Sequence, residues 1–454
     1  MAAILLTACS QTSEFHRPPL PVPEKWPSSI DKTHRSNTAK THWRDFFTDP
    51  KLQALIAAAL EHNRDLRIAV ARIEEARAQY GITRADKTPL LGILGSGNFT
   101  RTPADLSGTQ SSATSERYDF SLTMVSFELD FWGRLSGLSE AARLSYLATE
   151  EARRAVYLSL VADVASSYFT LLQLTALTAS AQLTVDLREQ SLSLVAKGRD
   201  LGGIYDYEFQ QATGTLESAR ASLAGIEHQR AVTTNRLNFL VGNAPLGPLP
   251  DGTLEEQGVD TNLAPGLPAD VLLMRPDVMA AEQRLIAAHA NIGAARAAFL
   301  PKILLTAGLG AASQGLTSLF TGGAWSFQPV ISIPLLDGGR IAAGVDIAEA
   351  RKFIAIAEYE KTIQLAFREV ADLLSARTSL SRQLRASIAN AAAQEKRLQI
   401  AQARYNTGLV SYLEVLDGQR ELVAALQIST QVRSAQLESA SQLYKALGGG
   451  LSHE

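Results

Sequence analysis

Residues 65–89 read DLRIAVARIEEARAQYGITRADKTP, and residues 277–301 read DVMAAEQRLIAAHANIGAARAAFLP. The two stretches align without a gap at an offset of 212 positions (277 − 65), and nine of their 25 positions are identical. Chance would give about two or three identities in windows this rich in alanine. The chain therefore contains an internal repeat, and this repeat decides how the rest of the sequence divides.

A second block of matches follows at an offset of 206 positions (339 − 133). It pairs Gly133-Arg134 with Gly339-Arg340, Gly202 with Gly408, Glu208 with Glu414, and Gly242 with Gly448. The same elements therefore recur in the same order in both halves. The offset changes by six residues between the two blocks (212 − 206), and we expect a loop to absorb the difference.

Each half predicts a helix followed by two short strands. The first helix should end at Pro89 in one half and at Pro301 in the other, because proline breaks a helix. The strands are expected at about 90–130 and about 302–336, where Gly, Ser and Thr mix with weakly alternating apolar residues. Segments of about ten such residues between turns are typical of membrane β-barrel strands. A pair of hairpins in a soluble domain is the alternative.

Two long helices complete each half. Residues 138–200 and 341–407 contain no proline, so each predicts a helix roughly 95–100 Å long at 1.5 Å per residue. Shorter helices return at about 204–241 and 411–447. Helices of this length favour coiled-coil-like packing. The uncharged run 164–185 is too rich in Ser, Thr and Gln for us to interpret it as a membrane-spanning helix.

The N-terminus carries the one cysteine of the chain, Cys9, after the apolar run AAILLTA. An apolar run that ends in small residues is typical of a secretory signal, and LTAC resembles a bacterial lipobox, in which the cysteine is lipidated after cleavage. Residues 1–9 therefore predict a signal with lipid attachment at Cys9, and Ser10 after it favours the outer membrane. Residues 10–42 include the proline-rich HRPPLPVPEKWPSS and predict an extended tether. Asp49 can cap the helix that follows, with Pro50 at its first position.

Four strands cannot close a barrel, and an open sheet edge cannot stand in lipid, because its N–H and C=O groups find no water there. If the strands span a membrane, the chain must oligomerise. Three copies would supply 12 strands around a lumen, whereas two copies would give eight strands and a filled barrel.

The chain resembles the outer-membrane factors of tripartite efflux systems, the TolC-like family, and within it the lipoprotein branch serving RND-type drug and heavy-metal exporters. The matching stretches, in family order, are LTAC, HRPPLPVPEKW, DPKLQALIAAALEHNRDLR, FELDFWGRL, RPDVMAAEQRLIAAHANIGAARAAFLP, GLVSYLEVLDGQREL and LYKALGGG. The resemblance implies a mixed α and β membrane protein, in which long antiparallel helices form an α-barrel and four strands per chain join a trimeric 12-stranded β-barrel.

The resemblance also implies a division into domains and a function. The first repeat would span 43–242 and the second 275–448, with an equatorial segment at 243–274 and a tail at 449–454. The protein would be a passive gated duct, without enzymatic activity, exporting small molecules or metal ions. Its partners would be two further copies, a periplasmic adaptor, an RND-type inner-membrane pump and the lipid of the outer membrane.

The resemblance places a gate at the turns between the long helices. The motif YNTGLVSYLEVLD contains Glu414 and Asp417, which are three residues apart and therefore share a helix face. In a trimer each would form a ring of three carboxylates, which attracts cations. Glu208, the repeat mate of Glu414, is a further candidate, and Tyr405 matches a family position that latches the closed state. The family often has a basic residue two positions after the glycine, where this chain has Val410.

The other conspicuous residues are interpreted as structural. Gly133-Arg134 and Gly339-Arg340 each follow a strand and would redirect the chain into a helix. Lys and Arg number 43 and Asp and Glu 46, so the near-neutral charge does not favour a nucleic-acid partner. The seven histidines are scattered, and no metal-ligand spacing, nucleotide loop or cofactor motif is found. An alternative function is a lipid-anchored periplasmic scaffold of long helices, which would leave the paired strand segments without a role.

Overall fold

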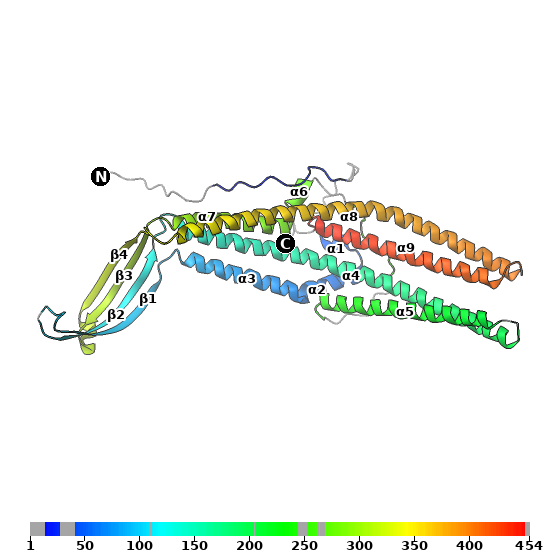
Figure 1. The fold of residues 1–454 in the computed structure, drawn as a ribbon, viewed down its shortest axis with the longest axis horizontal. Helices are drawn as coiled ribbons and strands as arrows, with labels where there is room; N and C mark the ends of the chain where they lie inside the picture. The colour runs from blue at the N-terminus through cyan, green and yellow to red at the C-terminus, as the bar shows by residue number, and fades with distance from the viewer. Residues whose placement is uncertain are drawn as a thin grey trace. The chain divides into compact units, whose positions relative to one another are not determined.

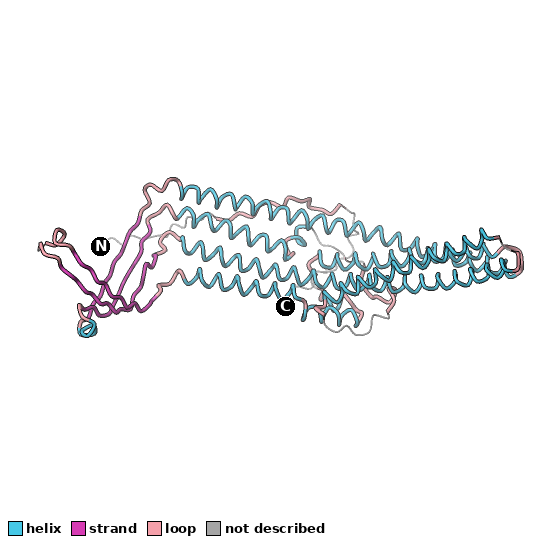
Figure 2. Tube along the Cα trace, turned by 60° about the horizontal axis from the view of Figure 1, so that its bottom comes forward, coloured by secondary structure: helices cyan, strands magenta, loops and turns pink. Residues whose placement is uncertain are grey.

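The structure, a computed structural model, describes residues 14–27, 41–108, 110–203, 205–243, 252–261, 263 and 268–449. These residues form two compact units. The strand unit comprises Arg72–Glu150, Ala280–Glu360 and residues 14–19, and the helical unit comprises the described residues of Leu20–Ala71, Glu151–Met279 and Lys361–Glu454. Each unit therefore takes segments from both halves of the repeat. The connectivity is traced in Figure 1, and Figure 2 separates helices from strands.

The two halves contain the same elements at nearly the same lengths. The first half holds α3 (Arg64–Ala85), β1 (Leu91–Thr102), β2 (Ala113–Glu128), α4 (Arg134–Asp200) and α5 (Asp206–Leu240). The second half holds α7 (Pro276–Ala297), β3 (Lys302–Ser313), β4 (Gly323–Ser332), α8 (Arg340–Asn406) and α9 (Tyr412–Ala446). Both α4 and α8 have 67 residues, and both α5 and α9 have 35. The predicted repeat of a helix, two strands and two long helices is confirmed.

The offset between the halves changes mainly at the turn of the hairpins. Phe99 pairs with Glu116, whereas its counterpart Ala311 pairs with Gly323, so the offset of 212 before the turn becomes 207 after it (323 − 116). Within β2 the register with β3 shifts between Met124 and Phe127, and Ser126 has a φ of 53°. The expected length difference in a loop is therefore confirmed for five of the six residues, and the sixth is the extra residue of the β2 bulge.

The first helix of each half stops before the predicted proline. Helix α3 ends at Ala85 and α7 at Ala297, and a single further turn follows, with hydrogen bonds from Thr88 N to Ala85 O (2.9 Å) and from Leu300 N to Ala297 O (3.1 Å). The residue that precedes a proline is disfavoured in the helical region, so each helix ends a turn before Pro89 and Pro301 rather than at them.

The four strands form one antiparallel sheet in the order β1-β2-β3-β4. The predicted strand segments thus pair as two hairpins, and β2 pairs with β3 across the repeat. Strands β1 and β4 are the two edges of this sheet. The 3₁₀ helix η2 (Leu316–Thr321) lies in the connection between β3 and β4. Pro329, which has no N–H to donate, lies in edge strand β4, where proline is tolerated.

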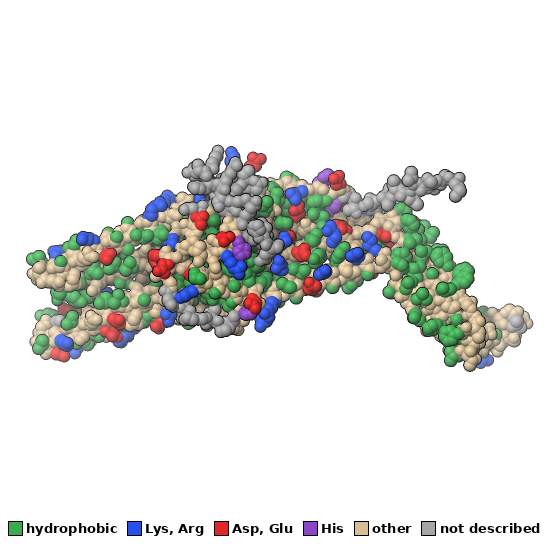
Figure 3. All heavy atoms as spheres, turned by 180° about the vertical axis from the view of Figure 1, so that it is seen from behind, with side chains coloured by type: hydrophobic (Ala, Val, Ile, Leu, Met, Phe, Trp, Pro, Cys, Tyr) green, Lys and Arg blue, Asp and Glu red, His purple; other side chains and the backbone are tan. Residues whose placement is uncertain are grey.

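The register gives the sheet one apolar face and one polar face, since residues paired across strands share a face. The apolar face carries Leu91, Ile93 and Phe99 of β1, Phe120, Leu122 and Met124 of β2, Leu305, Ala307 and Leu309 of β3, and Trp325, Phe327 and Ile331 of β4. The opposite face carries Ser96, Asn98, Thr100, Asp119, Ser121, Thr123, Ser326 and Gln328, with Leu94, Leu304 and Val330 as apolar exceptions. Large apolar residues such as Ile93 and Trp325 are 72% and 79% exposed. Hydrophobic side chains gather over the strands in Figure 3.

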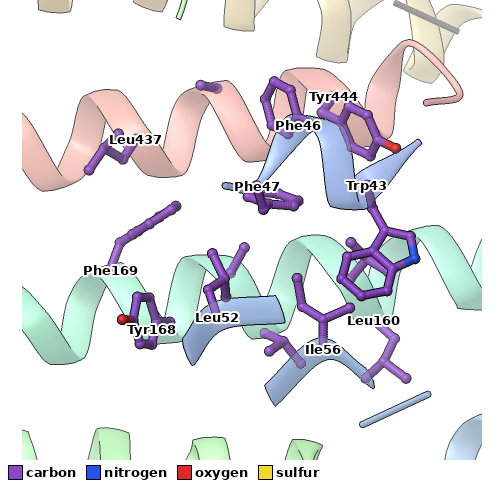
Figure 4. Packing of buried hydrophobic residues seen from close by; sticks show 14 of the residues in the cluster. Trp43, Phe46, Phe47, Leu52, Ile56, Leu160, Tyr168, Phe169, Leu437 and Tyr444 are labelled. Carbon is purple, nitrogen blue, oxygen red and sulfur yellow. The ribbon is translucent and has the colours of Figure 1, made fainter. Parts of the chain in front are cut away.

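The core of the helical unit forms where the N-terminal helices α1 (Trp43–Phe46) and α2 (Pro50–His62) pack against α4 and α9. Figure 4 shows Trp43, Phe46, Phe47, Leu52 and Ile56 pointing between these helices. The rings of Phe46 and Tyr444 stack with centroids 4.5 Å apart, and the Tyr444 hydroxyl donates to Thr41 O at 2.8 Å. Leu254 and Leu263 of the predicted equatorial segment join the same cluster.

Asp49 caps helix α2 as predicted, and it also binds two other elements. Its carboxylate accepts hydrogen bonds from Lys51 N (2.8 Å), the Tyr168 hydroxyl (2.6 Å) and Gln257 Nε2 (2.9 Å).

Among the described residues one helix, α4, has a window apolar enough to cross a membrane, and 61% of that window is buried. Tyr168 and Phe169 of this helix are buried in the core, so the apolar run serves packing.

Candidate functional site

Both hairpin turns between the long helices are built in the same way. Gly202 ends α4 and Gly408 ends α8, each with a φ of 74°. Gly202 N donates to Arg199 O and Gly203 N to Gly198 O, while Gly408 N donates to Tyr405 O and Leu409 N to Arg404 O, all at 2.9–3.0 Å. This hydrogen-bond pattern ends a helix with a left-handed residue, the conformation that glycine adopts without strain. The two turns lie at the same end of the helical unit (Figure 1).

The predicted acidic residues lie at the start of α9, and arginines hold both of them. Glu414 binds Arg404 of α8 at 2.9 Å. Asp417 binds Arg397 of α8 at 2.5 Å and Arg420 of its own helix at 2.8 Å. The side chains of Glu414 and Asp417 are 41% and 39% exposed, so both pairs lie at the surface of this chain. Two ion pairs thus tie α8 to α9 beside the turn.

Aromatic and apolar contacts join the same two helices. Tyr405 faces Tyr412 across the turn, with ring centroids 5.2 Å apart. One and a half turns into α9, a Cβ at Gly418 would lie 3.4 Å from Leu398 Cα. The absence of a side chain at Gly418 therefore lets α9 approach α8 closely, and Val415 is buried beside it.

The first hairpin lacks this set of ion pairs. The positions that match Arg397, Arg404, Asp417 and Arg420 at the offset of 206 are Ser191, Gly198, Gln211 and Gly214. Glu208 retains the acid of Glu414, and no ion pair is recorded for it among the described residues. Arg199 instead lies over the ring of Phe209 at 3.9 Å and near Asp206 at 3.7 Å. The pairs beside the turn are therefore specific to the α8–α9 hairpin, whereas α4 and α5 are joined farther from their turn by Arg220, which binds Glu189 at 2.7 Å.

Each turn also exposes large apolar side chains. Leu201 and Tyr205 lie in the α4–α5 turn, and Leu409 lies in the α8–α9 turn beside Leu413 in the first turn of α9. Leu201 is 87% exposed and Leu409 is 72% exposed. Apolar side chains so exposed at a tip are typical of surfaces that contact another protein.

Sequence reasoning identified the acids and missed their arginine partners. Arg404 and Glu414 are equidistant from Leu409, so an antiparallel hairpin centred there predicts that they face one another. Arg397 and Asp417 are 20 residues apart, and their contact depends on how the two helices pack rather than on a symmetric position about the turn.

The strand-to-helix turns hold the glycine-arginine pairs. Gly133 and Gly339 have φ values of 74° and 85°. The Asp130 carboxylate accepts from Leu135 N (3.0 Å) and Ser136 N (2.7 Å), and that of Asp337 accepts from Gly339 N (3.0 Å) and Ile341 N (2.7 Å). An acid therefore caps each long helix at the point where the chain leaves the sheet.

The two arginines of these turns differ. Arg134 forms a bidentate pair with Glu128, at 2.6 and 2.8 Å. Arg340 has no recorded ion pair among the described residues. Near Pro301, the Trp132 ring N–H donates to the proline carbonyl at 2.8 Å.

Cys9, the predicted lipid attachment site, lies outside the described residues.

Comparisons with known proteins agree with this arrangement. The family model described as outer membrane efflux protein matches residues 55–243 and 267–449, the two halves of the repeat. The cation efflux system protein CusC of Escherichia coli O157:H7 is 43% identical over 99% of this chain and 97% of its own length. The solvent efflux pump outer membrane protein SrpC of Pseudomonas putida is 41% identical over 99% of this chain and 97% of its own.

Solved structures share the fold over almost the whole chain. A crystal structure of CusC, from work on its folding and transmembrane channel formation, has a TM-score of 0.83 at 41% identity and covers 97% of this chain and 100% of its own. The open state of the Neisseria gonorrhoeae MtrE outer membrane channel has a TM-score of 0.88 at 34% identity, covering 98% of this chain and 99% of its own. With the repeat, the two-faced sheet and the long helices, these matches confirm the resemblance, and the chain belongs to the outer membrane efflux protein family.

Proposed function

We propose that three copies of the chain assemble a gated duct through the outer membrane, which exports small molecules or metal ions delivered from the inner membrane. The sheet carries this proposal. Its apolar face suits lipid and its polar face suits a water-filled lumen, as in membrane β-barrels. Strands β1 and β4 are edges within one chain, and edges in lipid must pair. Twelve strands satisfy them and leave a lumen.

The gate is assigned to the hairpin turns. Asp417, Glu414 and Glu208 would ring the constriction in the trimer, with Tyr405 beside them. Asp417 and Glu414 form ion pairs with Arg397 and Arg404 within one chain. Opening of the gate would therefore either break these ion pairs or move α8 and α9 together with the pairs intact. The tips of both hairpins would dock a periplasmic adaptor of an RND-type pump, through exposed side chains such as Leu201 and Leu409. Cys9 would add a lipid anchor.

The assembly is tested by electrophoresis and by conductance. Detergent-extracted protein should run as a trimer when unheated and as a single chain after boiling. Reconstituted into a planar bilayer, it should give cation-selective currents. A protein that runs as one chain without heating and gives no current in any variant would contradict the duct.

The gate is tested by Asp417→Ala and Glu414→Ala in the same bilayers, with Glu227→Ala, which removes an exposed acid of α5, as the control. We expect larger or less cation-selective currents in the first two variants and unchanged currents in the control. Currents identical to wild type in all three would place the gate elsewhere.

The anchor is tested with Cys9→Ser. A barrel carrying this change stays in the membrane and needs detergent for extraction, whereas a scaffold held by lipid alone is released as soluble protein. Release would therefore contradict the duct and support the scaffold.

A further inference from the structure

A cavity of about 390 Å³ lies in the strand unit, where β3 and β4 meet the start of α8. Its polar lining consists of Lys302 of β3, Ser332 of β4 and Arg340 of α8. The remaining lining is small or apolar, namely Ala295, Ala298, Pro334, Ile341 and Gly344. Two cationic side chains and a hydroxyl therefore share one hollow.

Neither cation has a recorded partner in the described part of the chain. No ion pair or side-chain hydrogen bond is recorded for Lys302 or Arg340 there. The acid next to this turn, Asp337, is engaged elsewhere, since its two oxygens accept from the backbone N–H groups of Gly339 and Ile341. None of the residues that line the hollow is acidic, so the hollow itself carries two positive charges.

At the equivalent place in the first half, the arginine is paired with an acid. Arg134, the repeat mate of Arg340, is held by both oxygens of Glu128. The mate of Lys302 at the offset of 212 is Leu90. The second half therefore keeps the arginine, lacks the acid and gains a lysine. The second half thus differs from the first at this place, since it has two cationic side chains that line a cavity.

The two strand residues that line the cavity lie on the polar face of the sheet. Lys302 is paired with Ser332 across the strands, and the alternation along β3 places Lys302 on the face that carries Thr306 and Gly308. If the proposed function holds, this face lines the lumen, and three copies contribute six cations at the point where the barrel meets the helices.

We propose that Lys302, Arg340 and Ser332 form a subsite for oxyanions: the carboxylate, phosphate or sulfate group of an anionic solute in the duct. A guanidinium and an ammonium bind such oxygens through charge-assisted hydrogen bonds, and the hydroxyl supplies a further donor. The lumenal position rests on the proposed function, whereas the subsite belongs to a single chain.

The test measures protection of Arg340 from phenylglyoxal, which modifies guanidinium groups. Full-length detergent-solubilised protein is treated in inorganic phosphate and in chloride at matched ionic strength, and the modification of each arginine is followed by mass spectrometry. Phosphate is expected to slow the modification of Arg340 several-fold. Arg134 is the internal control, since Glu128 occupies it in both buffers, and its rate is expected not to change.

Lys302→Gln is the matched variant. It keeps the size of a polar side chain and removes the charge, so phosphate is expected to protect Arg340 much less. Equal Arg340 rates in the two buffers, or protection that survives Lys302→Gln, would overturn the subsite. Because each arginine is measured within one chain, the result stands apart from trimer formation and conductance, and failure of the duct would leave it readable.

Discussion

At the scale of single residues, the ion pairs of the α8–α9 hairpin offset the negative charge of its two acids. Asp417 lies between Arg397 and Arg420, and Glu414 faces Arg404. Exposed pairs of this kind contribute about 0.2–1 kcal/mol each, so they bias the hairpin without locking it. In a trimer, a ring of these acids would also contain their arginine partners. The net charge of the ring would therefore depend on whether the ion pairs stay formed.

Exchanging the charges of Arg397 and Asp417 distinguishes the effect of the ion pair from the effect of the charge that a ring of acids would carry. Arg397→Asp or Asp417→Arg alone places like charges together and is expected to loosen the hairpin and raise the open fraction in bilayer recordings. The double swap restores an ion pair and should return gating toward wild type. If each single variant gates as wild type does, the pair between these helices has no part in the gate.

Asp49 shows how one side chain ties the core of the helical unit. Burial raises the pKa of the Asp49 carboxyl, but hydrogen bonds from Tyr168, Gln257 and the backbone outweigh it, so the pKa lies below its usual value. The ionised form is therefore stabilised by folding. Since the folded-state pKa is below the unfolded value of about 3.9, this stabilisation is complete above about pH 4 and is lost as the pH falls through the folded pKa.

We expect Asp49→Ala to lower stability at neutral pH by about 1–2 kcal/mol, because it removes a helix cap and the hydrogen bonds that Asp49 accepts from the Tyr168 hydroxyl and the Gln257 amide. The difference from wild type should shrink below about pH 4. Thermal unfolding as a function of pH measures it, with Asp65→Ala, an exposed acid in the first turn of α3, as the control. A deficit that stays constant from neutral to acid pH would contradict this role.

At the scale of elements, the pairing of β2 with β3 joins the two halves of the repeat. The strands approach so closely at Gly310 that a Cβ there would lie 2.1 Å from Phe120 O and 2.5 Å from Ser121 Cα. Backbone atoms of a paired strand cannot give way without loss of ladder hydrogen bonds. At Gly92 of β1, by contrast, a Cβ would meet nothing within 4 Å.

Gly310→Ala is therefore expected to disrupt the sheet and to abolish the species that runs as a trimer without heating. Gly92→Ala makes the same chemical change at an open position and should preserve that species. Equal amounts of unheated trimer in both variants would show that the β2–β3 contact tolerates a methyl group.

At the scale of the whole molecule, the repeat predicts the register of the seam between copies. Phe120 pairs with Ala311 inside the chain. By the registers of the two hairpins, Phe327 is the residue of the second half that corresponds to Phe120. By the offset of 212, Phe99 is the residue of the first half that corresponds to Ala311. If β4 meets β1 of the next copy as β2 meets β3, Phe327 lies opposite Phe99 on the lipid face.

Cysteines at Phe99 and Phe327 in one chain should therefore cross-link neighbouring copies into a covalent trimer on non-reducing gels. Cysteines at Asn98 and Phe327 are the control, because a slip of one residue puts the side chains on opposite faces. Stronger cross-linking in the control pair than in the Phe99 pair would contradict the register.

The sequence was most informative where a pattern is local or repeated. Matching glycines marked both hairpin turns, and Asp49 with Pro50 marked the start of a helix, because turn and cap chemistry acts within a few residues. It was less informative about partners from distant segments. Asn63 and Arg275 occupy matching positions in the two halves, and each donates to the carbonyl at the end of its long hairpin, Leu240 O at 2.9 Å and Ala446 O at 3.0 Å. The residues differ, so no identity in the alignment marks them.

The sequence by itself determined the repeat, the order of elements, the membrane class of the strands and the family, because periodicity, proline and glycine act on neighbouring residues. Only the tertiary structure decided which charges meet. The arginines that hold Glu414 and Asp417, the acid that holds Arg134 and the cavity beside Arg340 depend on the packing of helices and strands far apart in the chain. Electrostatic pairing needs side chains within a few ångströms, a condition that spacing along the sequence does not specify.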